Sequence, residues 1–315
     1  MLRKILEAKP FIIAEVGSNW QTLDDCKKSI SQAKLCGADA VKFQLYTHKD
    51  LYGFYGTMKG ELRQDWLPKL KEKADACGIE FMCSAFSEKL LDVVDPFVNV
   101  HKLASSEACH KRMLERLKRY GKPILISFGS HTQNDVEKVM NFMDDSHVIP
   151  LYCVASYPAK HIELENLVEL ILNYDVAGFS DHSTDVAVIG RAAFKAGACV
   201  IEKHVDFVGS TGPDAPHSLT GEEFKAYVAS IRRVTAMPKL YTTDRDMDMR
   251  HKRRLKAITQ INQGDTFKYG VNFGIFRSLT DDAKASHPFY VDQIDGKKST
   301  KTILVGDGIW VGEVE

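Results

Sequence analysis

The sequence predicts a closed (β/α)8 TIM barrel followed by a small β-rich domain. Apolar runs of strand length alternate with amphipathic segments of helix length from Pro10 to about Met237. The strand-like runs are almost continuously apolar, which is typical of parallel strands covered by helices. Eight such units within residues 1–237 match a barrel better than an open doubly wound sheet, and no Gly-x-Gly-x-x-Gly motif follows the first run.

The expected elements follow one another in a regular order. The eight strand-like runs are Phe11–Val16, Ala40–Gln44, Glu80–Ser84, Val98–Leu103, Pro123–Phe128, Val148–Val154, Val176–Ser180 and Cys199–His204. The segments between them predict helices, among them Leu23–Leu35, Leu62–Ala76, Val136–Met143 and Val186–Ala196, with a last helix at about Gly221–Val234. Each strand is therefore followed by the long connection that parallel neighbours require.

The chain changes in character after Met237. Residues 238–250 are polar and charged, which predicts a linker. Residues 251–315 contain short β-rich runs separated by glycines. We therefore expect a catalytic barrel over 1–237, a linker over 238–250 and a small β-rich domain over 251–315.

Composition excludes several classes of function. The chain has 42 basic and 42 acidic side chains, so no net charge would attract nucleic acid or an anionic membrane. No apolar run approaches the roughly 18 residues of a membrane span, and the start lacks the apolar core of a signal peptide. The seven cysteines are odd in number and form no Cys-x-x-Cys pair, which favours reduced thiols in the cytoplasm. The basic run Arg250–Arg254 is more simply a solvated segment at a domain start than a nucleic-acid site.

The polar residues at the ends of the expected strands share one face. Side chains two residues apart along a strand point the same way. The residues of this parity are Glu15, Lys42, Gln44, Ser84, Lys102, Ser127, Ser180, His182, Glu202 and His204, with Ser105, Glu107 and Tyr157 at or just beyond strand ends. One polar residue at a strand end is usually a solvated rim residue. The same pattern on nearly every strand instead predicts an active site at the C-terminal mouth of the barrel.

The residue types indicate which chemistry this mouth supports. Two lysines and several serine hydroxyls form a set of donors suited to a phosphate and a carboxylate. His182 and His204 end adjacent strands, so their imidazoles can share one metal ion, and with oxygen ligands they suit manganese, iron, cobalt or zinc. Glu15, Glu107 and Glu202 are then candidates for proton transfer or for support of a metal ligand.

At these residues the chain resembles the N-acetylneuraminate (sialic acid) synthase family, of NeuB type. The matching motifs are Phe11-Ile-Ile-Ala-Glu-Val-Gly17, Gly37-Ala-Asp-Ala-Val-Lys-Phe-Gln44, His101-Lys-Leu-Ala-Ser-Ser-Glu107, Gly121-Lys-Pro-Ile-Leu-Ile-Ser-Phe-Gly129, Cys153-Val-Ala-Ser-Tyr-Pro158, Gly178-Phe-Ser-Asp-His182, Ile201-Glu-Lys-His204 and Gly212-Pro-Asp214. Their order covers almost the whole barrel. The segments Ala257–Gly264 and Ile294–Lys298 resemble the family's antifreeze-like (SAF) domain.

The resemblance implies a reaction and a role for each residue. The family condenses phosphoenolpyruvate with the aldehyde of a mannosamine-type sugar and releases phosphate. Phosphoenolpyruvate would be held by Lys42, Ser84, Lys102, Ser105, Ser127 and Ser180. His182 and His204 would bind a divalent metal, usually Mn²⁺, with Mg²⁺ or Co²⁺ as alternatives. The sugar would be contacted by Gln44, Glu107, Tyr157 and Asp214, and Glu15 would lie near the reacting centre.

The resemblance also implies a domain-swapped homodimer. In this family the tail domain covers the partner subunit's barrel mouth and supplies an arginine to the N-acyl group of the sugar, and Arg277 stands at that position.

Several residues depart from the family pattern, mostly on the side that faces the sugar. The departures include Trp20, Ser106, Phe128, Ala155 and the tail loop that begins at Arg277. They favour a synthase for an atypical sugar. Two alternatives stay open: another 2-keto sugar acid synthase that takes a different or phosphorylated aldose, and a non-catalytic sugar-binding paralogue.

Overall fold

A computed structural model describes residues 5–6, 10–143, 147–234, 253–277 and 285–315. The chain divides into two compact units, Met1–Met237 and Pro238–Glu315. The predicted linker Pro238–Arg250 lies outside the described residues. Among the helices of the described ranges, none combines the length and apolar character needed to cross a bilayer.

The first unit is the predicted barrel. Its strands are β1 (Phe11–Gly17), β2 (Ala40–Leu45), β3 (Glu80–Ala85), β4 (His101–Leu103), β5 (Ile124–Phe128), β6 (Val148–Cys153), β7 (Gly178–Asp181) and β8 (Val200–Asp206). Each strand pairs in parallel with the next, and β8 pairs with β1 to close the sheet. A ninth short strand, β9 (Leu219–Thr220), pairs in parallel with β8. The sequence-based prediction of a (β/α)8 barrel is therefore confirmed.

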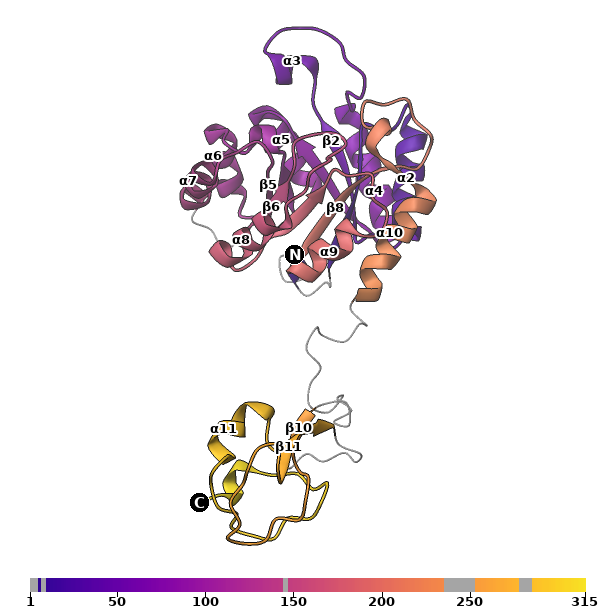
Figure 1. Cartoon of the computed structure of the whole chain (residues 1–315). Coiled ribbons are helices and arrows are strands. Elements are labelled where there is room, and N and C mark those ends of the chain that lie inside the picture. Colours follow the sequence, from indigo (N-terminus) through magenta and orange to yellow (C-terminus); the bar gives the residue numbers. More distant parts are fainter. Residues whose placement is uncertain (1–4, 7–9, 144–146, 235–252, 278–284) are drawn as a thin grey trace. The chain divides into compact units, whose positions relative to one another are not determined.

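Helices surround the strands (Figure 1). They are α2 (Leu23–Leu35), α3 (His48–Tyr52), α4 (Leu67–Cys77), α5 (Glu88–Val94), α6 (Lys111–Tyr120), α7 (Gln133–Met143), α8 (Leu164–Tyr174), α9 (Ile189–Ala196) and α10 (Gly221–Val234). Local signals set several of their ends. Thr22 and Asp25 form a capping box at the start of α2, and Gly78 ends α4 in the left-handed conformation, which glycine adopts without strain.

Several predicted boundaries were wrong by two residues or more, and two of them lie beside a short 3-10 turn. The fourth strand begins at His101 instead of Val98, and a short 3-10 helix, Asp95–Phe97, precedes it. The helix predicted from Leu62 begins only at Leu67, after the 3-10 turn Gln64–Trp66, because Pro68 lacks an N–H and fits only the first turn of a helix.

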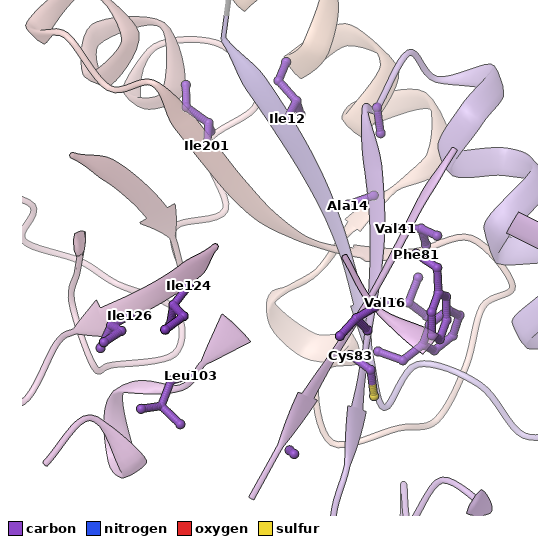
Figure 2. Close-up of a cluster of buried hydrophobic side chains, with 14 of the residues drawn as sticks. Ile12, Ala14, Val16, Val41, Phe81, Cys83, Leu103, Ile124, Ile126 and Ile201 are labelled. Atoms are coloured by element: carbon purple, nitrogen blue, oxygen red, sulfur yellow. The ribbon is translucent and has the colours of Figure 1, made fainter. Parts of the chain in front are cut away.

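Two hydrophobic layers follow from the alternation of side chains along the strands. The larger layer lies between strands and helices, and part of it is drawn in Figure 2; it includes Ile12, Ala14, Val41, Phe81 and Ile126. The smaller layer fills the lower lumen of the barrel. It consists of Ile5, which precedes β1, and of residues with the opposite parity in and next to the strands: Phe11, Ile13, Ala40, Met82, Val100, Leu125, Ile149, Leu151 and Val200. The lumen face is therefore apolar at the N-terminal half of the strands and becomes polar toward their C-terminal ends.

The second unit has its own small core. Its antiparallel strands β10 (Arg253–Ala257) and β11 (Phe273–Arg277) pair Leu255 with Ile275. Isolated bridges, two 3-10 turns (Pro288–Tyr290 and Val311–Glu313) and the short helix α11 (Val291–Ile294) complete the described part. The core consists of Leu255, Ala257, Ile261, Phe267, Phe273, Ile294, Ile303 and Ile309. The resemblance of this unit to an antifreeze-like domain stays a prediction.

Candidate active site

The register of the barrel brings the predicted polar residues to one level. Glu15 pairs across the sheet with Lys42 on one side and with His204 on the other. Ser84 pairs with Lys102, and Ser180 pairs with Glu202. Because these residues also share the lumen face, their side chains meet directly above the apolar residues that fill the lower lumen.

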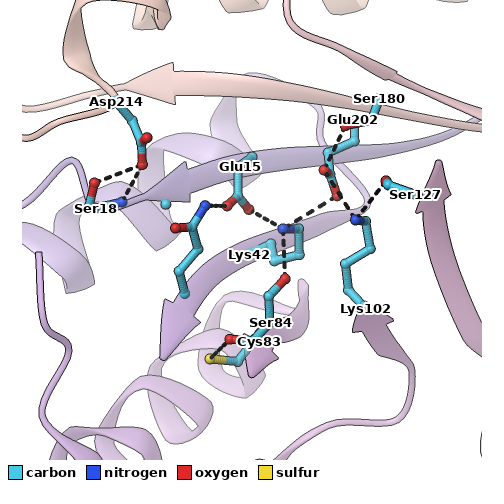
Figure 3. A network of polar contacts seen from close by, with 12 residues as sticks. Glu15, Ser18, Lys42, Cys83, Ser84, Lys102, Ser127, Ser180, Glu202 and Asp214 are labelled. Carbon is cyan, nitrogen blue, oxygen red and sulfur yellow. Dashed lines mark hydrogen bonds and ion pairs between the residues drawn. The ribbon is translucent and has the colours of Figure 1, made fainter. Parts of the chain in front are cut away.

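Lys42 is the centre of a buried ionic group (Figure 3). Its Nζ lies 2.7 Å from Glu15 Oε2 and 3.5 Å from Glu202 Oε2. It also donates a hydrogen bond to Ser84 Oγ at 3.1 Å. Gln44 Nε2 donates to the other Glu15 oxygen at 2.9 Å, so both carboxylate oxygens of Glu15 are occupied.

Lys102 lies beside this group and has weaker compensation of its charge. Its Nζ donates to Ser127 Oγ at 2.8 Å and to the Leu103 carbonyl oxygen at 3.1 Å, and its nearest carboxylate oxygen, Glu202 Oε1, is 3.9 Å away. Ser180 Oγ donates to the same Glu202 oxygen at 2.9 Å. Two ammonium groups and three serine hydroxyls are thus gathered around two carboxylates.

The two carboxyl groups have opposite pKa shifts. Burial raises the pKa of Glu15 to about 7, although Lys42 partly opposes the shift. Burial alone would also raise the pKa of Glu202, but Lys102 and Lys42 outweigh it and lower that pKa to about 2. At neutral pH Glu202 is therefore the more strongly acidic of the two, and Glu15 is the carboxyl group better suited to exchange a proton.

His182 and His204 are both buried at the mouth, with ring centroids 5.7 Å apart. His182 Nδ1 lies 2.7 Å from the Val154 carbonyl oxygen; this nitrogen carries the proton, because a carbonyl can only accept. Burial lowers the pKa of His182 to about 4 and that of His204 to about 3. Both imidazoles are therefore neutral at pH 7, which is the form that binds metal. The Val154 contact leaves His182 Nε2 unprotonated, and Ser180 Oγ lies 3.2 Å and Tyr157 Oη 3.4 Å from this nitrogen.

The structure also places the remaining predicted residues. The Tyr157 ring stacks on His182 at 4.3 Å, and Asp214 accepts hydrogen bonds from Ser18. Ser105 Oγ accepts from the backbone N–H groups of Gly129 and Ser130, so it ties the loops after β4 and β5 together.

Glu107 makes its hydrogen bond outside this polar network. Glu107, in the 3-10 turn Ser105–Glu107, accepts from Ser106 Oγ at 2.6 Å. Arg277 belongs to β11 of the second unit, and its side chain lies outside the described part of the structure.

Sequence reasoning missed three contributors. His217 follows Asp214 by three residues, and its ring lies 4.9 Å from that of His204 and 4.8 Å from that of Tyr157. The pair Asp181 and Lys203 is fully buried behind the two predicted histidines, with Lys203 Nζ 2.9 Å from Asp181 Oδ2. The Asp-x-x-His spacing after the last barrel strand was a usable signal for His217. Lys203 has the opposite parity to Glu202 and His204 and so points away from the lumen, and the sequence contained no signal that it would form a buried ion pair.

Comparison with known proteins shows which family the chain resembles. The family model described as the NeuB family matches residues 54–240. Pseudaminic acid synthase of Campylobacter jejuni is 28% identical and aligns over 98% of each chain. N,N'-diacetyllegionaminic acid synthase of Legionella pneumophila is 31% identical over 73% of this chain and 75% of its own.

A solved structure shows the same likeness in three dimensions. The crystal structure of N-acetylneuraminic acid (sialic acid) synthetase from Leptospira borgpetersenii, in complex with citrate, has a TM-score of 0.69 at 27% identity and covers 75% of this chain and 89% of that chain. The family model spans more than half of the sequence, and its matched range contains most of the polar residues of the barrel mouth. The chain belongs to the NeuB family.

Proposed function

We propose that this enzyme condenses phosphoenolpyruvate with the open-chain aldehyde of an N-acyl mannosamine-type aldose, giving a nonulosonic acid and phosphate. The named relatives are synthases of pseudaminic, legionaminic and sialic acids, so the type of reaction is common to the family. The particular aldose is our own proposal.

The observation that carries the proposal is the buried pair Lys42 and Lys102 with their serine neighbours. Phosphoenolpyruvate bears a phosphate and a carboxylate, and both need cationic and hydroxyl donors when they leave water. Lys102 is the better candidate for the phosphate, because its nearest carboxylate oxygen is 3.9 Å away. Lys42 is already paired with Glu15 at 2.7 Å and suits the carboxylate end. Ser84, Ser127 and Ser180 each lie within hydrogen-bond distance of a charged member of the group.

The proposed reaction is balanced in atoms and protons. The methylene carbon of phosphoenolpyruvate forms a bond to the aldehyde carbon, and the aldehyde oxygen takes up a proton. Water then adds to C2 and loses a proton, and the C–O bond to phosphate breaks. Glu15 is suited to exchange these protons, since its pKa of about 7 leaves both forms populated at neutral pH.

His182 and His204 would hold a divalent metal ion, with Mn²⁺ the first choice. Two buried, neutral imidazoles at adjacent strand ends fit such an ion. When bound, the metal supplies Lewis-acid polarisation of the aldehyde oxygen. The chain's own residues keep His182 in place: the Val154 carbonyl orients it, and Tyr157 stacks on it.

The sugar would contact Gln44, Glu107 and Tyr157 at the mouth, with Asp214 beside them. We propose that Arg277 of a partner subunit closes the mouth and contacts the N-acyl group, in a homodimer. The support for this part is the resemblance of the tail to the family's terminal domain.

The direct test measures phosphate release from phosphoenolpyruvate with a panel of N-acylated aldoses, in the presence of Mn²⁺. Release with an N-acyl mannosamine that stops in excess chelator, and in His204→Ala, supports the proposal. Release only with a phosphorylated or diacetylated deoxy sugar would replace the substrate with that one. No release with any aldose, despite phosphoenolpyruvate binding, would favour a non-catalytic paralogue.

A further inference from the structure

Three metal-binding side chains meet on one side of the barrel mouth: His204 at the end of β8, and Asp214 and His217 in the loop that follows it. One ligand atom from each residue lies within 4.8 Å of the others. His204 and His217 are only 5% and 7% exposed. The spacing is that of groups arranged around one ion, and burial makes it costly for their polar atoms to lack a partner.

Each of the three residues keeps a polar atom free. His204 Nδ1 and His217 Nε2 have no hydrogen-bond partner among the residues that the structure describes. Asp214 Oδ2 accepts from both the backbone N–H and the hydroxyl of Ser18, at 2.9 and 2.7 Å. Its Oδ1 faces His217 Nε2 at 3.7 Å, which is too long for a hydrogen bond. Ser18 thus anchors one carboxylate oxygen, and the other remains for a cation.

The loop that carries Asp214 and His217 is held firmly against the first strand's end. Buried Asn19 donates from Nδ2 to the Val205 carbonyl and to Ser218 Oγ, and Ser218 Oγ donates to the Asp214 carbonyl. At Gly212 a Cβ atom would come within 2.4 Å of the Ser18 carbonyl oxygen, so only glycine permits this approach. The fold of the loop therefore fixes where Asp214 and His217 lie.

We infer that Asp214 and His217 are further protein ligands of the divalent metal, in addition to the pair His182 and His204 of the proposed function, so that the ion is held by imidazoles and one carboxylate. Such a set suits Mn²⁺, Fe²⁺ or Co²⁺ and leaves positions open for substrate oxygens. His182 lies next to this group, with its ring centroid 5.7 Å from that of His204. The inference rests on the proposed function for the use of the metal, but metal binding itself is measured without turnover.

The test measures equilibrium binding of Mn²⁺ alone. Electron paramagnetic resonance of the unbound ion gives the affinity, and spin-echo modulation of the bound ion reports coordination by imidazole nitrogen. His217→Ala should weaken Mn²⁺ binding by at least about tenfold and reduce the nitrogen modulation. Asp214→Asn keeps an oxygen for Ser18 while it removes the charge, and should also weaken binding. His161→Ala, at an exposed histidine of the loop after β6, is the matched control and should behave as wild type.

The outcomes separate this inference from the proposed function. Wild-type affinity and unchanged modulation in a folded His217→Ala, checked by circular dichroism, would overturn the inference while the proposed reaction stands. If the wild-type chain binds no Mn²⁺, both the three-residue site and the metal-dependent reaction are wrong. If His217→Ala does not fold, Asp214→Asn decides: unchanged binding in that variant rejects the site.

Discussion

At the residue scale, Lys42 and Lys102 lie in the same lumen but have opposite pKa shifts. Burial lowers the pKa of Lys102, and Glu202 compensates only in part. Burial also acts to lower the pKa of Lys42, but Glu15 and Glu202 outweigh it, so the pKa rises. The charge of Lys102 is therefore less well compensated than that of Lys42, and an anionic ligand would stabilise it more.

Lys102→Ala should weaken the binding of phosphoenolpyruvate by one to two orders of magnitude, since a hydrogen bond to a charged group contributes about 1.5–3 kcal/mol. Titration calorimetry with phosphoenolpyruvate measures this directly. Lys195→Ala, which removes an exposed lysine of α9, is the control and should bind as wild type does. Unchanged affinity in Lys102→Ala would reject its assignment to the substrate.

Glu15 predicts a pH dependence of stability. The folded chain raises this pKa from 4.5 to about 7, so the folded state holds a proton that the unfolded state has released. The stability that Glu15 contributes is fully present below pH 4.5 and is lost as the pH rises through about 7. A pKa difference of this size between the folded and unfolded chain corresponds to a loss of as much as about 3 kcal/mol in the free energy of unfolding.

Glu15→Gln should remove this dependence. Denaturant unfolding of the metal-free chain between pH 5 and 8 compares the two proteins, and the wild type should lose stability relative to the variant as the pH rises. A constant difference across this range would show that Glu15 is ionised throughout in the folded chain.

At the scale of elements, a buried brace joins β7, β8 and α10 outside the lumen. Asp181 Oδ2 accepts from Lys203 Nζ at 2.9 Å and from Tyr227 Oη at 2.8 Å, and its Oδ1 accepts from Ser183 Oγ at 2.6 Å. His182 lies between Asp181 and Ser183 in the chain. The brace therefore fixes the backbone that aims His182 into the mouth.

Asp181→Asn should cost about 3–5 kcal/mol, because it leaves the ammonium of Lys203 buried without its counter-charge. For a unit of this size the melting temperature should fall by roughly 10 °C. Asp92→Asn is the matched control: Asp92 pairs with Arg116 at the surface, and its loss should cost less than about 1 kcal/mol. Equal effects of the two substitutions in calorimetry would contradict a structural role of the brace.

At the scale of the whole molecule, the chain has a barrel unit and a separate tail unit. The proposed homodimer predicts that two inactive variants restore each other. His204→Ala and Arg277→Ala, mixed under conditions of subunit exchange, should recover part of the wild-type activity, because some dimers then hold one intact mouth. In a mixture of His204→Ala and Lys102→Ala, every subunit carries a substitution in its own barrel, so no dimer has an intact mouth and the mixture should stay inactive. Full activity of Arg277→Ala alone, or no recovery despite proven exchange, would mean that the tail of one subunit does not complete the site of the other.

The side-chain directions at the candidate site were predictable wherever they depend on the alternation along a single strand. Phe11, Ile13 and Glu15 have the same parity, and so do Val100 and Lys102; the first members fill the lower lumen and the last reach its polar mouth. This alternation is a property of the extended backbone alone. The strand boundary near Pro96 and the helix boundary near Pro68 were less accurate, because each regular element there is preceded by a short 3-10 turn.

The sequence by itself determined the order of the barrel's elements, the lumen face of each strand and the set of polar groups at the mouth. The tertiary structure decided which polar groups come together, including some that the sequence did not single out: Lys42 with Glu15, His217 with His204 and Asp214, and Lys203 with Asp181. The physical reason is that periodicity reports the direction of a side chain relative to its own backbone. A contact between groups on different strands and loops depends on register, loop path and closure of the sheet, which only the folded chain fixes.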